Sequence, residues 1–199
     1  PEDEAFRDEL RGWLDTELPQ FLAQWAEREV VPAEDGGDEI MGAMERRRAW
    51  QRRLNTGQWA AINWPKEWGG PVATVTQNVV YSEEMARART PGIYNANGLW
   101  QIGPMIIQWG TDEQKEQSIP HILTADDHWC QGFSEPEAGS DLANLRTMAV
   151  QDGDDYVLNG QKIWISTAHI AKWGLYLVRT DPGAIERGEK HMGITALIV

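Results

Sequence analysis

The chain has 199 residues, 41% of them hydrophobic, and a formal charge of 18 − 31 = −13. This length suits one large domain or two small ones, and the composition is typical of a soluble protein that buries a core. The absence of an apolar run of about 18 residues excludes a membrane span, and the acidity argues against a nucleic-acid backbone as the main ligand. The single cysteine, Cys130, excludes an internal disulfide, and no secretory signal opens the chain, so a cytoplasmic location is expected.

Helical patterns fill the first part of the chain. Apolar residues recur at helical spacing near the N-terminus, at Phe6, Leu10, Trp13, Leu14 and Leu18. They predict one buried helix face with acidic residues opposite, and Pro19 is expected to end or kink this helix. Residues 1–40 hold 13 acidic and 3 basic residues, so −10 of the total charge lies there.

A basic run follows in MERRRAWQRRLNTGQW, which is also predicted to be helical. It contains five arginines, at positions 46, 47, 48, 52 and 53. Two interpretations stay open from the sequence. The simpler one is a solvated helix face that balances the acidic residues, and the sharper one is a phosphate-binding patch.

Three further helices are predicted before residue 128, the first of them from Val75 to Arg89. The unusually apolar stretch from Tyr94 to Gly110 indicates a buried central helix, with a kink at Pro104. Thr111 then opens TDEQKEQ, where Thr111 and Gln114 have the spacing of a capping box.

After residue 128 the pattern changes to short β-branched or aromatic runs separated by turn signals. The dipeptide Asn159-Gly160 between two such runs predicts a β-hairpin. Helices first and strands second predict an α+β fold, in which an N-terminal all-α helical domain (1–126) precedes an incomplete antiparallel middle β domain (127–199). The final apolar run, GITALIV, lacks a following turn, so the β domain is expected to be truncated.

Common catalytic and metal-binding patterns are missing. The four histidines show no metal-ligand spacing, and no metal site is predicted. Cys130 lies in a strand-like run, which favours a buried structural thiol over a nucleophile. No catalytic residue is assigned from these patterns.

Two segments could bind a ligand. SEPEAGSD (134–141) is either a simple connector or a small-residue turn whose backbone amides converge on a diphosphate. In NGQKIWIST, the spacing of two places Trp164 and Ser166 on one face of a predicted strand. That face either packs in the core or offers an indole and a hydroxyl to a flat ligand with polar edges.

These two segments, WCQGFSEPEAGSD and YVLNGQKIWISTAHIAKWGLYLVRTDP, resemble the acyl-CoA dehydrogenase family. NWPKEWGG and IIQWGTDEQKEQSIPHIL are similar to that family as well, in the same order, so the resemblance extends from about residue 60. The motifs CQGFSEP and WIS-x-AH are most similar to those of bacterial members, including some that act on bulky acyl-CoAs such as the CoA esters of sterol side chains. The helix at 94–110 resembles the one that borders the acyl pocket in this family, although core packing is its simpler role.

The resemblance implies an FAD site in the middle domain. Gln131, Phe133 and Ser134 match positions that line the flavin ring, although Gln131 departs from a frequent aromatic residue and Glu137 from a frequent glycine. Gly139 and Ser140 match the pyrophosphate contact, and Ser140 also matches a position that touches the acyl-CoA. The second flavin segment is matched by Trp164, Ile165 and Ser166.

The implied reaction removes two hydrogens across Cα–Cβ of an acyl-CoA thioester: a carboxylate takes the α-proton and the flavin takes the β-hydrogen as hydride. In the family that base is a glutamate of the C-terminal domain, and no residue of this chain matches it. Glu135 lies in the flavin motif but is interpreted as structural. The fragment alone is therefore expected to be inactive.

The resemblance also implies an acyl-CoA substrate, electron-transferring flavoprotein as acceptor and a homotetramer. Two alternatives stay open. One is an acyl-CoA oxidase or flavin monooxygenase of the same fold, and the other is a non-catalytic subunit of a mixed oligomer.

Overall fold

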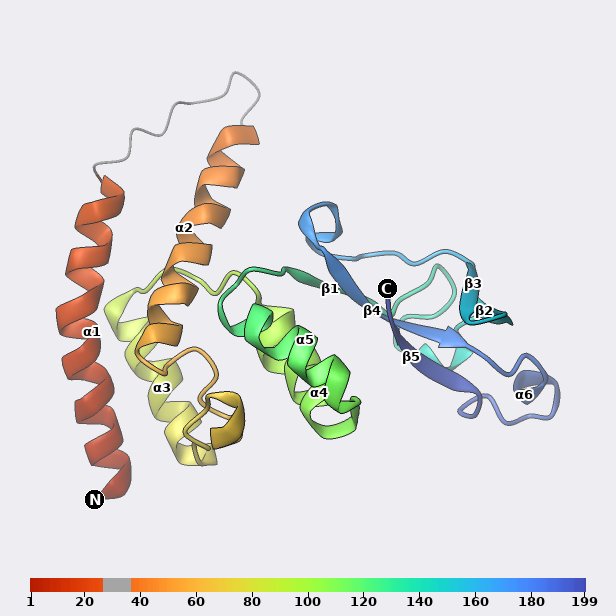
Figure 1. Ribbon diagram of the computed structural model, residues 1–199, viewed down its shortest axis with the longest axis horizontal. Coiled ribbons are helices and arrows are strands. Elements are labelled where there is room, and N and C mark those ends of the chain that lie inside the picture. The colour runs from red at the N-terminus through yellow and green to blue at the C-terminus, as the bar shows by residue number, and fades with distance from the viewer. Residues whose placement is uncertain (27–36) are drawn as a thin grey trace. The chain divides into compact units, whose positions relative to one another are not determined.

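The computed structural model describes residues 1–26 and 37–199. The chain divides into two compact units, Pro1–Asp126 and Asp127–Val199, of which the first is helical and the second is built on a sheet (Figure 1). This segregation of helices and strands confirms the α+β prediction. No helix among the described residues combines the length and the apolar character needed to cross a membrane.

The helical unit contains α1 (Glu2–Ala26), α2 (Gly37–Thr56), α3 (Val75–Ala88), α4 (Gly103–Trp109) and α5 (Asp112–Leu123), with a short 3-10 turn at Lys66–Trp68. The helix α1 continues past Pro19, so the proline does not end it. Leu18 and Phe21 are buried on either side of the proline. Their tertiary packing outweighs the loss of one backbone hydrogen bond.

The predicted apolar face of α1 is confirmed. Leu10, Leu14 and Leu18 are buried, and Phe6 and Trp13 pack against the same cluster. Across the cluster lie the buried residues Trp50, Leu54, Trp59, Ala60 and Ile62. Each large side chain removed from water contributes roughly 1.5–3 kcal/mol, so this aromatic cluster is a main source of stability for the unit.

The buried helix predicted at 94–110 is present over residues 96–109, but it is buried on one side only. A π-helical turn, η2 (Gly98–Ile102), leads into α4 without a break, so the irregular turn lies just before Pro104 in the first turn of α4. Ile102 and Ile106 are buried, but Trp100 is 61% exposed and Trp109 is 76% exposed. The segment therefore has one buried side, and its indoles lie on the other.

Local capping signals in the sequence are realised. Thr111 and Gln114 form the predicted capping box of α5, with distances of 3.0 and 3.2 Å. A second box, formed by Thr74 and Gln77 at the start of α3, was not predicted. Each box satisfies two amide groups that would otherwise lack an intrahelical partner.

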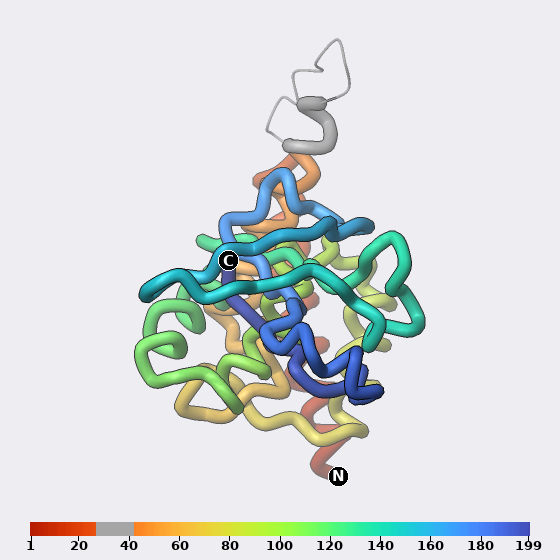
Figure 2. The backbone as a smooth tube through the Cα atoms, turned by 90° about the vertical axis from the view of Figure 1, so that its right-hand side faces the viewer, coloured from red at the N-terminus to blue at the C-terminus, as the bar shows by residue number. Residues whose placement is uncertain are grey.

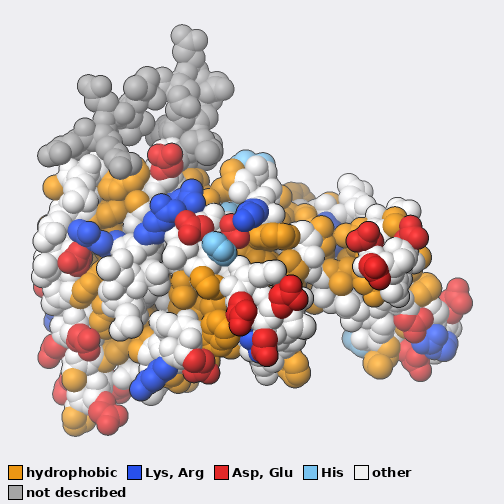
Figure 3. Space-filling view, viewed as in Figure 1, with side chains coloured by type: hydrophobic (Ala, Val, Ile, Leu, Met, Phe, Trp, Pro, Cys, Tyr) orange, Lys and Arg blue, Asp and Glu red, His pale blue; other side chains and the backbone are white. Residues whose placement is uncertain are grey.

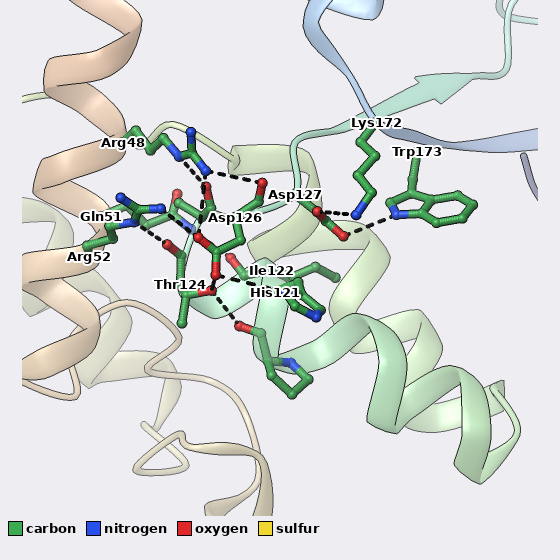
Figure 4. A network of polar contacts seen from close by, with 12 residues as sticks. Arg48, Gln51, Arg52, His121, Ile122, Thr124, Asp126, Asp127, Lys172 and Trp173 are labelled. Atoms are coloured by element: carbon green, nitrogen blue, oxygen red, sulfur yellow. Dashed lines mark hydrogen bonds and ion pairs between the residues drawn. The ribbon is translucent and has the colours of Figure 1, made fainter.

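The arginines of α2 hold the end of α5. Arg48 donates to the carbonyl oxygen of Ala125 at 2.7 Å, and Arg52 donates to that of Thr124 at 2.9 Å and to the Asp126 carboxylate at 2.6 Å (Figure 4). Arg53 pairs with Glu17 of α1 at 2.7 Å. Basic side chains gather over α2 and acidic ones over α5 in Figure 3. The arginines of α2 thus pair with acidic groups, as in the simpler interpretation, and they also connect α2 to α1 and to the end of α5.

The sheet unit contains β1 (Trp129–Gly132), β2 (Met148–Asp152), β3 (Asp155–Asn159), β4 (Trp173–Arg179) and β5 (Ile194–Ile198). Short helical turns lie at Leu142–Asn144 (η3), Ala168–Ile170 (η4) and Gly183–Glu186 (α6). The strand order is β1-β4-β2-β3, with β5 also paired to β4. Figure 2 shows β2 and β3 running side by side, and the C-terminus lies beside β4, where Val199 and Gly174 exchange backbone hydrogen bonds.

The sheet is mixed, so the expected antiparallel domain is corrected. β4 runs parallel to β1 and meets β2 in parallel at the pair Met148–Arg179, whereas β2–β3 and β4–β5 are antiparallel. The physical reason is the long connection between β1 and β4. A connection of that length allows the chain to return to the same end of the sheet before it enters the next strand.

The hairpin predicted at Asn159-Gly160 is wrong as well. The chain turns at Gly153 and Asp154 between β2 and β3, and Gly153 has a φ of 64°. Gly160 follows β3, and its lack of a side chain is needed for another reason. A Cβ at this position would collide with the side chain and backbone of Thr147. The glycine therefore permits a close approach between segments rather than a turn.

Candidate functional site

The first predicted ligand segment leaves β1 and turns back at once. Glu135 and Ala138 exchange backbone hydrogen bonds of 2.9 and 3.1 Å, which close a tight turn. Gly139 and Ser140 follow on the exposed side of this turn, and a Cβ at Gly139 would meet no atom within 4 Å. The turn thus presents small, accessible residues, as a backbone site for a diphosphate requires.

The second predicted segment is not a strand. Residues 161–165 have no regular structure, and both Trp164 (φ 57°) and Thr167 (φ 61°) are left-handed. The left-handed residue breaks the alternation that would have placed Trp164 and Ser166 on one strand face. The Trp164 side chain is 86% exposed, so it is not a core residue, and Ser166 is exposed too.

The structure brings the two segments together. The Ile163 amide donates to the Ser134 carbonyl oxygen at 2.9 Å, which places Ser134 beside the residue that precedes Trp164. Phe133 and Ser134 are half-buried, as is Ile165, and Gln131 lies on β1 opposite Leu175 of β4. Within the described chain, no hydrogen bond ties Gly139 or Ser140 to the Trp164 segment.

Glu135 is held as a structural anion. Its side chain is 7% exposed, and it accepts hydrogen bonds from Lys162 at 2.7 Å and from the Arg146 and Thr147 amides at 2.6 and 2.9 Å. Burial alone would raise the pKa of this carboxyl, but the Lys162 ammonium and the amide donors outweigh burial and lower it to about 2. A carboxylate with so low a pKa is a poor proton acceptor, which supports the structural interpretation of Glu135.

Two buried cations escaped prediction from sequence. Lys162 lies in the apolar run QKIWIS, and a charged residue at an inward position of such a run was a signal that could have found it. Arg179 of β4 is 1% exposed and donates to the carbonyl oxygens of Ala143, Leu145, Lys190 and Met192. It joins the chain after Ser140 to the loop before β5.

The helical unit contains a cavity of about 330 Å³. Its lining comes from the chain before the 3-10 turn, from α3 and from η2: Ala60, Ala61, Ile62, Asn63, Trp64, Asn78, Tyr81, Ser82, Leu99 and Trp100. The Trp64 indole N–H donates to the Leu99 carbonyl oxygen at 2.9 Å, and the Tyr81 hydroxyl donates to that of Trp59 at 2.9 Å. These bonds fix two aromatic walls and leave a mostly apolar hollow with a polar rim.

Metal and thiol chemistry find no support in the described residues. They contain no group of three or more His, Cys, Asp or Glu that could hold a metal ion. Cys130 is a free, buried thiol in β1, and burial raises its pKa, as expected of a structural cysteine.

Comparisons with known proteins identify a family for both parts of the chain. Residues 1–126 match the N-terminal domain of acyl-CoA dehydrogenase, and residues 130–199 match its middle domain. The acyl-CoA dehydrogenase IpdE1 of Mycobacterium tuberculosis is 39% identical over 196 residues, which are 98% of this chain and 48% of the relative. The chain therefore spans about half the length of the curated relatives it matches.

Two solved structures are similar over the whole chain. The ChsE4–ChsE5 complex from Mycobacterium tuberculosis has a TM-score of 0.74 and 37% identity, and this chain covers 46% of the matched chain. The Tcur3481–Tcur3483 steroid ACAD has a TM-score of 0.74 and 35% identity, with 47% of the matched chain covered.

Proposed function

The chain belongs to the acyl-CoA dehydrogenase family, and from this premise we propose that the full-length protein performs FAD-dependent α,β-dehydrogenation of an acyl-CoA thioester. Members of the family are flavoproteins. FAD, when bound, supplies the acceptor for the hydride that leaves Cβ of the acyl group.

One observation carries the proposal. The Ile163–Ser134 hydrogen bond joins the two segments that match the family's flavin positions, and directly beside it the Trp164 indole is exposed. An exposed indole on a left-handed residue offers a flat apolar surface that the chain does not use for its own core. The residues present therefore fit a flat aromatic ligand.

We assign the FAD contacts to the residues expected from the family. Gln131, Phe133 and Ser134 would line one edge of the flavin, and Trp164, Ile165 and Ser166 would line the other side. Gly139 and Ser140 would bind the pyrophosphate through the open turn, and Ser140 would also contact the acyl-CoA. The hydroxyls of Ser134 and Ser166 can donate hydrogen bonds to a ring edge, and the apolar residues would exclude water.

The base that removes the α-proton is proposed to lie outside this chain. Glu135 is the acidic residue nearest to the flavin positions in sequence. Its carboxylate, however, already accepts hydrogen bonds from three donors, one of which is the Lys162 ammonium. No residue of this chain matches the family's base. The chain by itself is thus proposed to supply most of the flavin site without the proton acceptor.

The substrate is proposed to be a steroid side-chain or fatty acyl-CoA. One similar solved structure is named a steroid ACAD. The cavity of about 330 Å³ is bordered by Leu99 and Trp100, which lie in the segment that resembles the border of the family's acyl pocket. A hollow of this size and apolar character suits part of a bulky acyl group.

The partners follow the family in this proposal. Electron-transferring flavoprotein would accept the electrons, and a homotetramer is the proposed assembly. The single cysteine of the chain suits a reducing compartment, and a cytoplasmic location is proposed on that ground.

Anaerobic titration of the full-length flavoprotein with acyl-CoAs tests the activity. We expect loss of the visible flavin absorbance with at least one member of a panel that contains fatty acyl-CoAs of several lengths and a steroid side-chain CoA ester. A flavin that stays oxidised with every thioester in the panel would contradict the proposal.

A mixed oligomer is the second candidate, because two similar solved structures carry names that join two different proteins. In that case a partner of related sequence would complete the site. A full-length protein that purifies without colour and takes up FAD only when a second acyl-CoA dehydrogenase-like chain is co-expressed would favour this candidate over the homotetramer.

A further inference from the structure

We infer that Lys162 is a positioning residue of the flavin site, which acts through its ion pair with Glu135. This inference rests on the proposed function and deepens it. Lys162 would not touch the flavin. It would hold the two flavin-binding segments in a fixed register and so determine where the Trp164 indole lies.

The contacts of Lys162 span both segments. Its ammonium donates to the Phe133 carbonyl oxygen at 3.1 Å and to the Glu135 carboxylate at 2.7 Å. The next residue, Ile163, donates its amide to the carbonyl oxygen of Ser134 at 2.9 Å. The three residues that follow β1, 133–135, are thus hydrogen-bonded to the two residues that precede Trp164, 162 and 163.

The same carboxylate reaches a third segment. Glu135 accepts hydrogen bonds from the amides of Arg146 and Thr147, which lead into β2. The Lys162 side chain is 4% exposed, so water competes little for these bonds. The ion pair therefore joins the end of β1, the approach to Trp164 and the approach to β2 at one buried point.

Trp164 depends on this support because its own side chain makes little contact with the protein. The indole is 86% exposed, and the residue has a φ of 57°, a conformation that a bulky residue keeps only when its surroundings hold it. The nearest constraints on its N-terminal side are the Lys162 and Ile163 contacts. Loss of Lys162 should free the Trp164 backbone, and the indole would then no longer be preorganised for a ligand.

A purely structural role would need only charge compensation for the buried Glu135 carboxylate. The two roles make different predictions for a double variant, E135Q/K162M, which removes both charges together. Charge compensation predicts that this variant behaves like the wild type. Positioning predicts that it regains stability relative to Lys162→Met but still binds FAD weakly, because the bond to the Phe133 carbonyl oxygen is absent.

The test compares full-length wild type with Lys162→Met, Lys162→Arg, E135Q/K162M and Lys172→Met. Lys172 is the matched control, because it also pairs with a buried carboxylate of the same unit, that of Asp127 at 2.8 Å (Figure 4), but its own side chain is 59% exposed. FAD affinity is measured by flavin fluorescence, and amide hydrogen exchange at Ile163 is measured in the flavin-free protein. The exchange experiment reports on the segment contact whether or not FAD binds.

We expect Lys162→Met and E135Q/K162M to weaken FAD binding at least tenfold and to speed exchange at Ile163 at least tenfold. Lys162→Arg should bring FAD affinity and the exchange rate at Ile163 part of the way back to the wild-type values, since a guanidinium keeps donors for the Phe133 carbonyl oxygen and the Glu135 carboxylate. Lys172→Met should change neither the FAD affinity nor the exchange rate. Wild-type FAD affinity in E135Q/K162M would overturn the inference and leave the proposed function intact. Failure of the wild type itself to bind FAD, alone or with its partners, would instead overturn the proposed function and the positioning role together.

Discussion

The carboxylate of Glu84 accepts a 2.6 Å hydrogen bond from the Arg11 guanidinium, so a buried anion of α3 is bound to a cation of α1. Arg7 and Arg87 complete the group at 2.8 and 2.6 Å, and the Glu84 side chain is 1% exposed. The hydrogen bonds, that of Arg11 foremost, hold the pKa of Glu84 well below its ordinary range even though burial acts in the opposite direction. One carboxylate thus fixes the packing of α3 on α1.

Glu84→Gln should destabilise the helical unit by roughly 2–3 kcal/mol, because three guanidinium groups lose their shared anion. The effect should stay below the roughly 3–5 kcal/mol of a fully buried pair, since the three arginines are partly exposed. Urea unfolding of the full-length protein, followed by tryptophan fluorescence, measures the change.

Glu83→Gln is the matched control for that measurement. Glu83 is the neighbouring residue and pairs with Arg7 at 2.8 Å, but more than half of its side chain is exposed. Its loss should change the free energy of unfolding by less than about 1 kcal/mol. Equal effects of the two substitutions would contradict the assignment of Glu84 as the buried anchor.

The Glu135 pair predicts a dependence of stability on pH. The folded pKa of Glu135 is about 2, below an ordinary value near 4.5, so its contribution is fully present above about pH 4.5 and disappears as the pH falls toward 2. Glu135→Gln lacks this titration. The difference in unfolding free energy between wild type and Glu135→Gln should therefore shrink between pH 5 and about 2.

Chemical denaturation at several pH values follows this difference. The comparison with the variant removes the contribution of other acidic groups, which titrate in both proteins. A difference that stays constant from about pH 5 to 2 would show that Glu135 has the same pKa in the folded and unfolded states.

Local sequence signals predicted the helical unit well. The face of α1 and the Thr111 capping box depend on residues within one or two turns of each other, so spacing alone was sufficient. The pairing of β1 with β4 could not be predicted in this way, because Trp129 and Trp173 are far apart in the chain and no local pattern gives their direction.

The two candidate segments were proposed from the sequence, but their geometry could not be predicted from it. The spacing of Trp164 and Ser166 suggested a strand, whereas the bond from Ile163 to Ser134 and the left-handed Trp164 decide the conformation. Both depend on contacts with another segment. The same holds for Asn159-Gly160, where the close approach to Thr147 uses the glycine and the hairpin forms elsewhere.

The left-handed backbone at Trp164 makes a prediction about strain. Trp164→Gly should be more stable than Trp164→Ala by about 1 kcal/mol, because glycine adopts a positive φ without the Cβ clash that alanine keeps. Both variants remove the indole, so both should weaken FAD binding by a similar factor. Thermal unfolding of the flavin-free full-length proteins tests the first statement, and FAD titration tests the second.

Equal stability of the two Trp164 variants would mean that the segment relaxes to a right-handed conformation without the indole. Wild-type FAD affinity in both variants would remove Trp164 from the proposed flavin contacts, while the contacts proposed for Ser134 and Ser140 would still stand to be tested.

Arg179 should be the most sensitive buried residue of the sheet unit. Its guanidinium donates to four carbonyl oxygens at 2.8–3.2 Å and orders the chain from Ala143 to Leu145 together with the loop at Lys190–Met192. Arg179→Met keeps the apolar stem but leaves these oxygens without their donor, which should cost roughly 3 kcal/mol or more. Arg179→Lys should recover only part of this lost stability, because a single ammonium cannot reach all four carbonyl oxygens that the planar guanidinium binds.

Arg146→Ala gives the comparison within the same unit, since the Arg146 side chain is exposed and its contribution to the Glu135 contact comes from the backbone amide. It should change the free energy of unfolding by less than about 0.5 kcal/mol. Because the segment that Arg179 orders begins at Ala143, shortly after Ser140, Arg179→Lys should also weaken FAD binding under conditions where the protein stays folded. A stable Arg179→Met variant with unchanged FAD affinity would show that the four carbonyl bonds neither hold the sheet unit together nor shape the proposed pyrophosphate turn.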